Sequence, residues 1–566
     1  MKTLALVLSL LPFTAFSFQP DVVLDDADTT AVELVGPWVA ETNLTNAFRG
    51  TSKVITGTTV NTAQYARFHT QLPVSGPWKV FVWHNGRTGF GDEVNIVTKV
   101  GGGETPTVTV GEHVYAGQWM LVGTYWFEHA EEAEVKIVHN DAGSLSADAI
   151  RFSFAAPEVI LDSTGDTTGV KMYNASGVIS SATWPSTAIP DGNEINTRRT
   201  TVVGAKIEFI PTLPTPGDYE VSVWLPRRGG GWISSGTGAT TITVEVHHRT
   251  GIATHTVDLP PDNGQNEGAW IKVGTTPFRF DATPSGQTGG PGKVVIKGPA
   301  ASGTCVPADA VRWNKVGTLA IYQDDDDPAG PPGVVLGTKL SNQTPNWLIQ
   351  YDVGQVARRF LYFDYQPFGA GFMRAQNNDQ RATYKPPLPE QGLYDVYLWY
   401  SYYNTNSPTT LLTVNGAYNS TGTKVNVSRT IDQRYEAGRW AHAGRYILDA
   451  NPAGPTVNSW LTIEPNNNTA TQFTKADGVL FLRDGEEADA DGDGLPDWKE
   501  IVLHTNSSGL DLNNDGRADG WDTDGDGMSD GYEYSLGLNP LSAPQPTTDS
   551  AIVGVTVLTP LAKAAQ

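Results

Sequence analysis

Short runs in which apolar and polar residues alternate recur along the chain. One example is 78–83, Trp-Lys-Val-Phe-Val-Trp, and residues that favour turns, Pro and Gly, bound this run and others like it. Alternation with a period of two places the apolar side chains on one face of a strand, whereas helical periodicity is scarcely present. The pattern predicts an all-β chain of antiparallel sheets, each buried on one face.

Three segments share one template, Leu-Pro-x-x-Gly-x-aromatic-x-Val-x-Val/Leu-Trp. A second element, Gly-x-Trp-x-x-x-Gly, and a third that opens with Ala-Asp follow each copy in the same order. The copies of the three elements are 72–83, 213–224 and 388–399; 117–123, 268–274 and 438–444; and 147–152, 308–313 and 476–481. Conserved order indicates three repeated units. The Leu-Pro-x-x-Gly element predicts a turn in which Gly takes a positive φ.

The repeated elements lie far enough apart for each unit to be a whole domain rather than a solenoid repeat. Many short strands with non-local pairing predict jelly-roll-like antiparallel β-sandwiches. We place a signal peptide at 1–17, three β-sandwich domains at 18–155, 156–316 and 317–484, a metal-binding segment at 485–542 and a tail at 543–566.

These motifs resemble the C-terminal domains of golvesin and of bacterial xanthan lyases, a family similar to carbohydrate-binding modules. The resemblance rests on the three repeated elements and covers most of 21–484. The first copy departs from it with Trp78 in place of Tyr, and the third closes with Ala-Asp-Gly-Val-Leu, without the Arg. The resemblance implies three tandem sandwiches that bind polysaccharide or cell-surface glycan. It also implies that a catalytic domain, where a family member has one, lies outside these sandwiches, and we find no segment of this sequence left for one.

Positions shared by all three copies are expected to serve the fold, because a repeat preserves what its fold needs. Such positions are Trp119, Trp270 and Trp440, together with Asp148, Asp309 and Asp477, which we interpret as core or turn-capping residues.

Glycan contacts are expected instead in the loop after each Leu-Pro strand, where the copies differ. An exposed ring can stack on sugar C–H groups while Arg or Asn forms hydrogen bonds with hydroxyls. The candidate glycan-binding residues are Trp83, Arg87, Arg227, Trp232, Tyr402 and Tyr403. The alternative is that these aromatic residues only cap the ends of the sandwiches.

Acidic residues are concentrated near the C-terminus. The chain has 38 Lys and Arg against 61 Asp and Glu, a net charge of -23, and 16 of the acidic residues fall within 484–533. Their spacing matches a twelve-residue calcium loop, with oxygen ligands at alternating positions and Gly at the sixth. The three loops are Asp489, Asp491, Asp493, Leu495, Asp497 and Glu500; Asp511, Asn513, Asp515, Arg517, Asp519 and Asp522; and Asp522, Asp524, Asp526, Met528, Asp530 and Glu533, where Leu495, Arg517 and Met528 offer backbone carbonyls.

These loops predict about three structural calcium ions, because calcium takes hard oxygen ligands from closely spaced carboxylates. An EF-hand would need a helix entering each loop, but a strand-like run precedes Asp489. The segment instead resembles a bacterial thrombospondin type 3 repeat, with short helices predicted at 498–504 and 532–536. The carboxylates would surround each ion and leave no open position for a substrate. The cluster 324–327 lacks this alternation, so we interpret it as a solvated interdomain turn.

Composition narrows the classes of protein that fit. Hydrophobic residues at 39% and aromatic residues at 10%, with only 17% charged residues, argue against disorder and coiled coils. The acidic balance argues against nucleic-acid and anionic membrane partners. The single cysteine, Cys305, excludes intrachain disulfides. Lys2, the apolar run 4–13 and Ala15-Phe16-Ser17 predict secretion, and no later run is long enough to span a membrane.

Catalytic motifs are absent from the sequence, which has no P-loop, no G-x-G-x-x-G and no H-E-x-x-H. The string 527–531 matches the nucleophile elbow G-x-S-x-G but lies inside the third calcium loop. The leading hypothesis is a secreted, non-catalytic protein that binds polysaccharide and has a calcium-stabilised C-terminal segment. One alternative is an adhesin, matrix or filament subunit without a sugar site, which self-associates through the C-terminal tail at 551–557. A polysaccharide hydrolase or lyase is the third.

Overall fold

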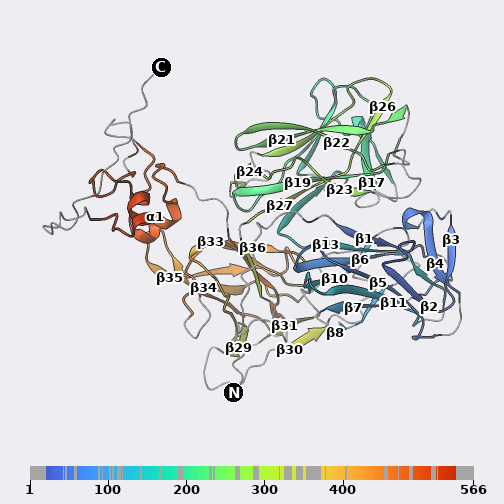
Figure 1. Ribbon diagram of the computed structural model, residues 1–566, viewed down its shortest axis with the longest axis horizontal. Helices are drawn as coiled ribbons and strands as arrows, with labels where there is room; N and C mark the ends of the chain where they lie inside the picture. The colour runs from blue at the N-terminus through green and yellow to red at the C-terminus, as the bar shows by residue number, and fades with distance from the viewer. Residues whose placement is uncertain are drawn as a thin grey trace. The chain divides into compact units, whose positions relative to one another are not determined.

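A computed structural model describes most of the chain between Gln19 and Ser542 (Figure 1). Outside the described residues lie 1–18, 20, 43, 45–46, 57–59, 87–88, 92–93, 101–102, 105–106, 111–116, 118, 141–142, 165–167, 189–195, 229–231, 234–235, 262–267, 285–291, 318, 324–333, 339–347, 352–370, 377, 402–404, 452–456, 470, 484–488, 511–517, 519 and 543–566. The chain forms two compact units, of which the first comprises Met1–Ala417 with Val425–Glu486 and the second Tyr418–Lys424 with Glu487–Gln566.

The first segment of the first unit, 22–154, forms two principal sheets and a small third one. Their strand orders are β1-β13-β6-β10, β2-β5-β11-β7-β8 with β9 paired to β7, and β12-β4-β3. The elements are β1 (Val22–Asp25), β2 (Val32–Val35), β3 (Val39–Thr42), the 3-10 turn η1 (Phe48–Gly50), β4 (Thr51–Ile55), β5 (Tyr65–Gln71), β6 (Gly76–Trp83), β7 (Val94–Val100), β8 (Gly103–Glu104), β9 (Val108–Val110), β10 (Trp119–Phe127), β11 (Glu132–Val138), β12 (Leu145–Ala147) and β13 (Ala149–Phe154). Val80 and Phe152 of one principal sheet share a core with Phe68 and Val135 of the other, which makes the segment a β-sandwich.

The second segment, 158–315, repeats this arrangement. Its sheets have the orders β14-β27-β19-β23 with β24 paired to β19, β15-β18-β25-β21-β22, and β16-β17-β26-β20. The elements are β14 (Glu158–Asp162), β15 (Val170–Tyr173), η2 (Ser181–Thr183), β16 (Ser186–Ala188), β17 (Asn196–Thr200), β18 (Lys206–Phe209), β19 (Gly217–Leu225), β20 (Thr237–Gly238), β21 (Thr241–His248), β22 (Gly251–Asp258), β23 (Ala269–Lys272), β24 (Phe278–Phe280), β25 (Lys293–Lys297), β26 (Thr304–Ala308) and β27 (Ala310–Lys315). Val221 and Trp313 pack with Phe209 and Val244 in one core.

The third segment, 319–483, has one long sheet and one short one. The long sheet has the order β28-β39-β33-β36-β34-β37-β32-β29 with β35 paired to β34, and the short one β30-β31-β38. The elements are β28 (Leu319–Gln323), β29 (Val334–Thr338), β30 (Leu348–Tyr351), β31 (Gly371–Ala375), β32 (Gln380–Tyr384), β33 (Gly392–Leu398), β34 (Thr410–Tyr418), β35 (Lys424–Ile431), β36 (Ala441–Leu448), β37 (Trp460–Glu464), β38 (Thr474–Ala476) and β39 (Val479–Arg483). Its core joins Val396 and Phe481 to Leu412 and Ile463 from the other half of the long sheet.

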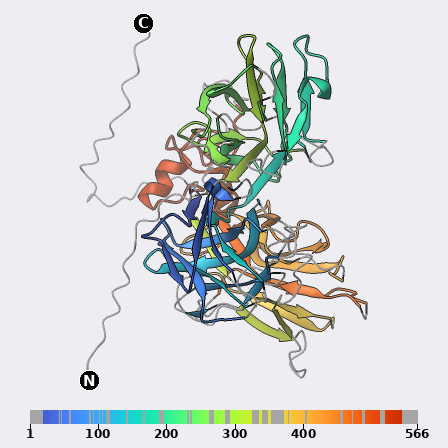
Figure 2. The same ribbon diagram turned by 90° about the vertical axis from the view of Figure 1, so that its right-hand side faces the viewer.

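The strand pairs confirm the predicted all-β class. The described residues contain two α-helices, α1 (Asp497–Leu503) and α2 (Asp530–Leu536), both in the second unit. Figure 2 shows the strands of the three segments from a second direction. The predicted positive φ of the turn glycine is confirmed at Gly76 and Gly217, whose φ angles are 148° and 139°, but is wrong at Gly392 of the third copy.

Each segment carries one pair of tryptophans in edge-to-face contact on the sheet face away from its core. The pairs are Trp83 with Trp119, Trp224 with Trp270, and Trp399 with Trp440, at centroid separations of 5.3, 5.5 and 5.4 Å. In the first two segments the paired residues are directly opposite each other across neighbouring strands. The repeated tryptophans therefore pack on the outer face of each sandwich rather than in its main core, and Trp440 is buried in a small cluster of its own.

Contacts from these outer faces join the segments of the first unit. The Arg151 guanidinium lies 4.8 Å from the ring of Trp119 in its own segment and 5.8 Å from that of Trp224 in the second. In the third segment, Trp440 Nε1 donates a hydrogen bond of 2.9 Å to the carbonyl of Ala155. The repeated outer face therefore serves packing between segments.

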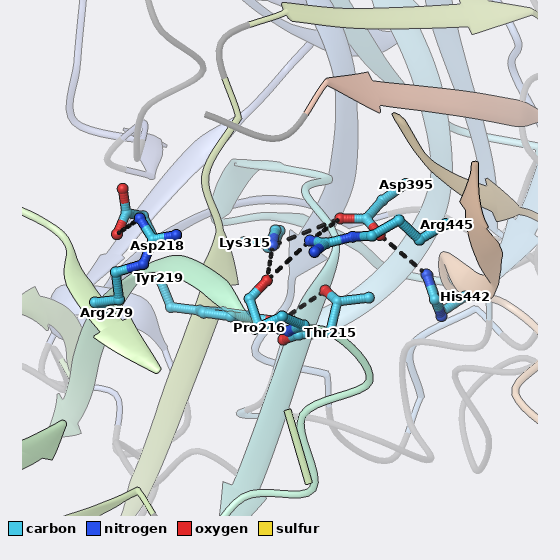
Figure 3. A network of polar contacts seen from close by, with 9 residues as sticks. All are labelled: Thr215, Pro216, Asp218, Tyr219, Arg279, Lys315, Asp395, His442 and Arg445. Carbon is cyan, nitrogen blue, oxygen red and sulfur yellow. Dashed lines mark hydrogen bonds and ion pairs between the residues drawn. The ribbon is translucent and has the colours of Figure 1, made fainter. Parts of the chain in front are cut away.

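A buried network of charged groups joins the second and third segments (Figure 3). Asp395 Oδ2 lies 3.5 Å from Lys315 Nζ, while Asp395 also accepts hydrogen bonds from Arg445 Nε and Nη2 at 3.1 and 3.2 Å. His442 Nε2 lies 3.2 Å from the same carboxylate, and Arg445 also donates to the carbonyl of Pro216 at 3.0 Å. Burial alone would raise the pKa of Asp395, but His442, Lys315 and Arg445 lower it to about 2.

Within the described part of the chain, no helix has the length and apolar character needed to cross a bilayer.

Replacing Asp395 by Asn should destabilise the first unit by about 3 kcal/mol, because Lys315 and Arg445 would lose a buried counter-charge. Urea unfolding followed by tryptophan fluorescence would measure this loss. Asp218→Asn is the matched control, since Asp218 forms a more exposed pair with Arg279 at 3.3 Å and its loss should cost less than about 1 kcal/mol.

The difference in the free energy of unfolding between wild type and Asp395→Asn should depend on pH. A carboxyl whose folded pKa is about 2 stabilises the fold above its unfolded pKa, and this contribution disappears as the pH falls from about 4 towards 2. A difference in stability that stayed constant between pH 6 and pH 2 would contradict this account.

Candidate functional site

The first predicted metal loop folds around the carboxylate of Asp489. Its Oδ1 accepts the amide of Gly492 at 2.7 Å, and its Oδ2 accepts that of Gly494 at 2.9 Å. Gly494 adopts a φ of 95°, which favours glycine at this turn. Asp489, Asp491 and Asp493 each offer one oxygen, and these oxygens all lie within 4.8 Å of one another.

The third predicted loop repeats the same geometry. Asp522 accepts the amides of Gly525 and Gly527 at 2.8 and 2.7 Å, and the φ of Gly527 is 94°. The carboxylates of Asp522, Asp524 and Asp526 again offer oxygens within 4.8 Å of one another. Alternating carboxylates on a tight loop therefore converge twice, as calcium ligands would.

The acidic residues at the twelfth positions, Glu500 and Glu533, come from the helices that follow the loops. Both side chains are fully buried. Within the described residues, Glu500 Oε2 and both carboxylate oxygens of Glu533 accept no hydrogen bond, and the same is true of Asp491 Oδ2 and Asp524 Oδ2. Buried carboxylate oxygens without donors are costly unless a cation compensates them, so this donor set fits a hard divalent ion.

Burial and crowding of these carboxylates raise their pKa values. Burial, followed by the charges of Asp491 and Asp493, raises the pKa of Glu500 to about 8. Burial, followed by the charges of Asp524 and Asp526, raises the pKa of Glu533 to about 7. The carboxylates therefore repel one another as long as no cation lies among them.

The ninth-position aspartates close the loops rather than joining the convergent oxygens. Asp497 Oδ1 accepts the amide of Ala490, and Asp530 Oδ1 accepts that of Thr523, each at 2.8 Å. Asp497 and Asp530 thus each accept a backbone amide of their own loop, and their ligand role stays a prediction.

The first and third loops are also joined to each other. Gly531 donates its amide to Asp493 Oδ2 at 2.7 Å, and the Ser529 hydroxyl donates to the Asp493 carbonyl at 3.2 Å. Ser529 in turn caps α2 by accepting the amide of Tyr532 at 3.2 Å. Asp493 thus connects the two loops into one small structure.

The other predicted metal ligands either form hydrogen bonds within the loops or lie outside the described residues. Leu495 and Met528 stand at the seventh positions, where their amides donate to Asp493 and Asp526 at 2.6 and 2.8 Å. The second loop lies outside the described residues at Asp511, Asn513, Asp515, Arg517 and Asp519. The two helices agree with the prediction of short helices that leave the loops rather than enter them.

The expectation of exposed aromatic platforms is wrong at two of the six candidate glycan residues. Trp83 is 2% exposed and packs against Phe48 and Trp119, while Trp232 is 0% exposed. Trp232 Nε1 donates to the carbonyl of Arg227 at 2.7 Å, so this indole packs under its loop. Neither ring presents a face to solvent.

The other four candidate glycan-binding residues do not form one site within the described residues. Arg227 is half-buried, whereas Arg87, Tyr402 and Tyr403 lie outside the described residues. Ser401, which precedes Tyr402 in the sequence, has a described neighbour, because Asn406 Nδ2 donates both to the Ser401 carbonyl at 3.0 Å and to the Gln433 carbonyl at 2.7 Å.

That neighbouring loop carries an exposed aromatic residue that sequence reasoning missed. Tyr435 is 66% exposed, and its carbonyl accepts the hydroxyl of the buried Tyr400 at 2.7 Å. Arg434 lies 5.7 Å from its ring and is held by two hydrogen bonds to Asp432, at 2.8 and 2.6 Å. The sequence could have indicated Tyr435 as a candidate, because it lies just before the repeated Gly-x-Trp element, in a loop whose sequence differs between copies.

Tandem antiparallel sandwiches followed by aspartate-rich loops define a modular β protein with a candidate metal centre. Residues 22–154 and 170–315 match the Golvesin C-terminal domain, and residues 522–543 match the bacterial TSP3 repeat. Two segments of the chain thus match the golvesin C-terminal domain, and a third matches a bacterial TSP3 repeat. The third predicted copy lies outside the matched residues and is supported here by the sequence repeat and the Trp399–Trp440 pair.

Solved structures give weaker likenesses. A Paenibacillus xanthan lyase is 14% identical with a TM-score of 0.22, and the match covers 80% of this chain but 39% of that one. The CBM22-1-CBM22-2 tandem domain of Paenibacillus barcinonensis Xyn10C is 13% identical, with a TM-score of 0.20 and coverage of 54% and 98%. The ANX1 ectodomain of Arabidopsis thaliana is 8% identical, with a TM-score of 0.19 and coverage of 53% and 96%. No curated protein matches the chain.

Calcium binding at pH 7 should release protons, because Glu500 with a pKa of about 8 is mostly protonated without a cation and must ionise to bind one. The apparent affinity should accordingly rise between pH 6 and pH 9. Isothermal calorimetry in two buffers of different ionisation enthalpy would measure the release. Equal binding enthalpies in both buffers at pH 7 would contradict the raised pKa values.

Proposed function

We propose that this protein is secreted, has no catalytic activity, and binds polysaccharide or cell-surface glycan, while calcium holds its C-terminal segment together. The golvesin C-terminal domains support the glycan-binding role, and the TSP3 repeat supports the calcium role. The apolar N-terminal run after Lys2 and the single cysteine support export of a chain that needs no disulfide.

The observation that carries the calcium role is the convergence of carboxylates in two loops of equal geometry. Buried Glu500 and Glu533 lie beside these loops with oxygens that lack donors in the described residues. Calcium would supply the positive charge that the carboxylates need, and the chain's own oxygens would surround it. The ions would be structural, about three in number when the second loop is included.

The glycan role is best supported at the loop around Tyr435. Its exposed ring could stack on a sugar, and the Arg434 guanidinium, held in place by Asp432, could donate hydrogen bonds to hydroxyl groups. Asn406 connects Ser401 to Gln433 of the same loop, and Tyr402 and Tyr403 directly follow Ser401 in the sequence. The third segment, rather than the first two, would then make the principal contact.

Tyr435→Ala should weaken glycan binding about tenfold or more, because it removes an exposed ring that contributes on the order of 1.4 kcal/mol. An array of bacterial and plant polysaccharides, probed with the full chain in calcium, would first identify a ligand for titration. Tyr532→Ala is the matched control, since Tyr532 is 56% exposed but lies in α2. Absence of binding to every polysaccharide would reject the role, and fibres lost on deleting 551–566 would support the filament alternative.

Glu533→Gln should weaken calcium binding at the third loop at least about tenfold, because it removes a charged oxygen donor at the ion. Calorimetric titration of the full chain would show one ion bound more weakly. Glu390→Gln is the control, since Glu390 is exposed and pairs with Arg483 on the third segment. Unchanged affinities in Glu533→Gln would reject this loop as a calcium site.

A further inference from the structure

A second group of acidic side chains lies in the first sandwich, far along the chain from the C-terminal loops. Asp25 ends β1, Asp26 follows it, and Asp148 stands between β12 and β13. All three are buried, with exposures of 2%, 3% and 0%. Each offers one carboxylate oxygen, and these oxygens lie within 4.8 Å of one another.

Strand pairing brings these residues together. Asp25 is opposite Ala149 in the antiparallel pair of β1 and β13, and the amide of Asp26 donates to the Asp148 carbonyl at 2.7 Å. The Asp148 carboxylate accepts the amide of Phe48 at 3.1 and 3.2 Å, so the 3-10 turn η1 closes over the group. The arrangement therefore connects three parts of the sandwich at one point.

The described donors do not satisfy the carboxylates of Asp25 and Asp26. Asp25 Oδ1 accepts the amide of Ala27 and Asp26 Oδ1 accepts the Thr51 hydroxyl, but Oδ2 of both residues is buried and accepts no hydrogen bond in the described part of the chain. Lys53 Nζ approaches Asp26 Oδ2 only to 3.5 Å. A buried charged oxygen in this state calls for a cation.

The charge balance points the same way. Among the described residues, the carboxylates of Asp25, Asp26, Asp28 and Asp148 lie near two cations, Lys53 and Arg49, and Asp28 accepts the amide of Asp25. This excess of carboxylates and the all-oxygen donor set fit one hard divalent ion.

We propose that Asp25, Asp26 and Asp148 bind a hard divalent cation, Ca²⁺, that ties β1 to the β12–β13 junction of the first sandwich. This site is separate from the C-terminal loops and does not depend on the glycan role. Its ligands come from distant parts of the sequence, so the ion stabilises the closed sandwich rather than a local loop.

The second sandwich provides an internal comparison, because it has lost one of the carboxylates. Asp162 and Asp309 correspond to Asp25 and Asp148 by strand register, but Ser163 replaces Asp26. Asp162 Oδ1 accepts both the amide and the hydroxyl of Thr164 at 2.7 Å. In the second sandwich, two carboxylates thus remain of the three, and Thr164 donates two hydrogen bonds to one of them.

In the second sandwich, Arg198 occupies the position that corresponds to Lys53 of the first. Arg198 is opposite Ala308 in the register that places Lys53 opposite Ala147, and Arg198 Nε donates to the Ser163 carbonyl at 3.2 Å. We therefore expect no ion in the second sandwich. In the third, the corresponding Asp324 and Asp325 lie outside the described residues.

Hydrogen exchange of the full chain, read by mass spectrometry with calcium and with chelator, tests the site. The amide of Phe48 reports on it because it donates to Asp148, whereas the amides of Gly492 and Gly525 report separately on the C-terminal loops. At calcium concentrations 100 times the dissociation constant, exchange in the peptide around Phe48 should slow about 100-fold. Asp26→Asn should abolish this slowing, and Asp162→Asn, the matched control, should retain it.

A second variant keeps the test decisive if Asp26→Asn does not fold. Lys53→Met removes the ammonium 3.5 Å from Asp26, so calcium should bind the site more tightly and slow exchange around Phe48 at lower concentrations. If calcium slows exchange only in the C-terminal loops and never around Phe48, in wild type or in Lys53→Met, the proposal is overturned. Protons shared among the carboxylates would then account for the buried group.

Discussion

The compensation of buried carboxylates governs much of this structure. A carboxylate that leaves water needs donors or a cation, since its desolvation otherwise opposes folding. Asp395 meets this need within the chain, from the side chains of Lys315, Arg445 and His442. Among the described residues, Glu500 Oε2 and both carboxylate oxygens of Glu533 accept no hydrogen bond. The same constraint therefore gives a polar link between sandwiches in the first unit and a candidate metal centre in the second.

The sequence repeat preserves two different surfaces of each sandwich. One is the core, and the other is the outer sheet face that carries the tryptophan pair. In the first segment, Arg151 extends this face to Trp224 of the second. The departure noted in the third copy falls on this surface too: Leu480 replaces the arginine and packs with Trp399 and Trp440. A change at one repeated position thus alters how the segment meets its neighbours while leaving its core unchanged.

Local patterns predicted the strands, the glycine turns and the metal loops, because each of these is specified by residues close together in the sequence. Alternation could not say what covers the second face of a sheet, so Trp83 was expected in solvent and is buried against Phe48. The carboxylates of Asp25 and Asp148 are brought together only by the pairing of β1 with β13. Long-range pairing is the information that a single sequence leaves out, although the recurring Ala-Asp element was a signal that these aspartates matter.

The tryptophan pairs limit how this chain can be divided. A sandwich separated from its neighbours would expose rings that other segments now cover, and it would lose the Trp440 hydrogen bond to Ala155. Exposed apolar surface of that kind promotes association between molecules. The three sandwiches are thus better regarded as one unit of inheritance, because a division between them would uncover these rings.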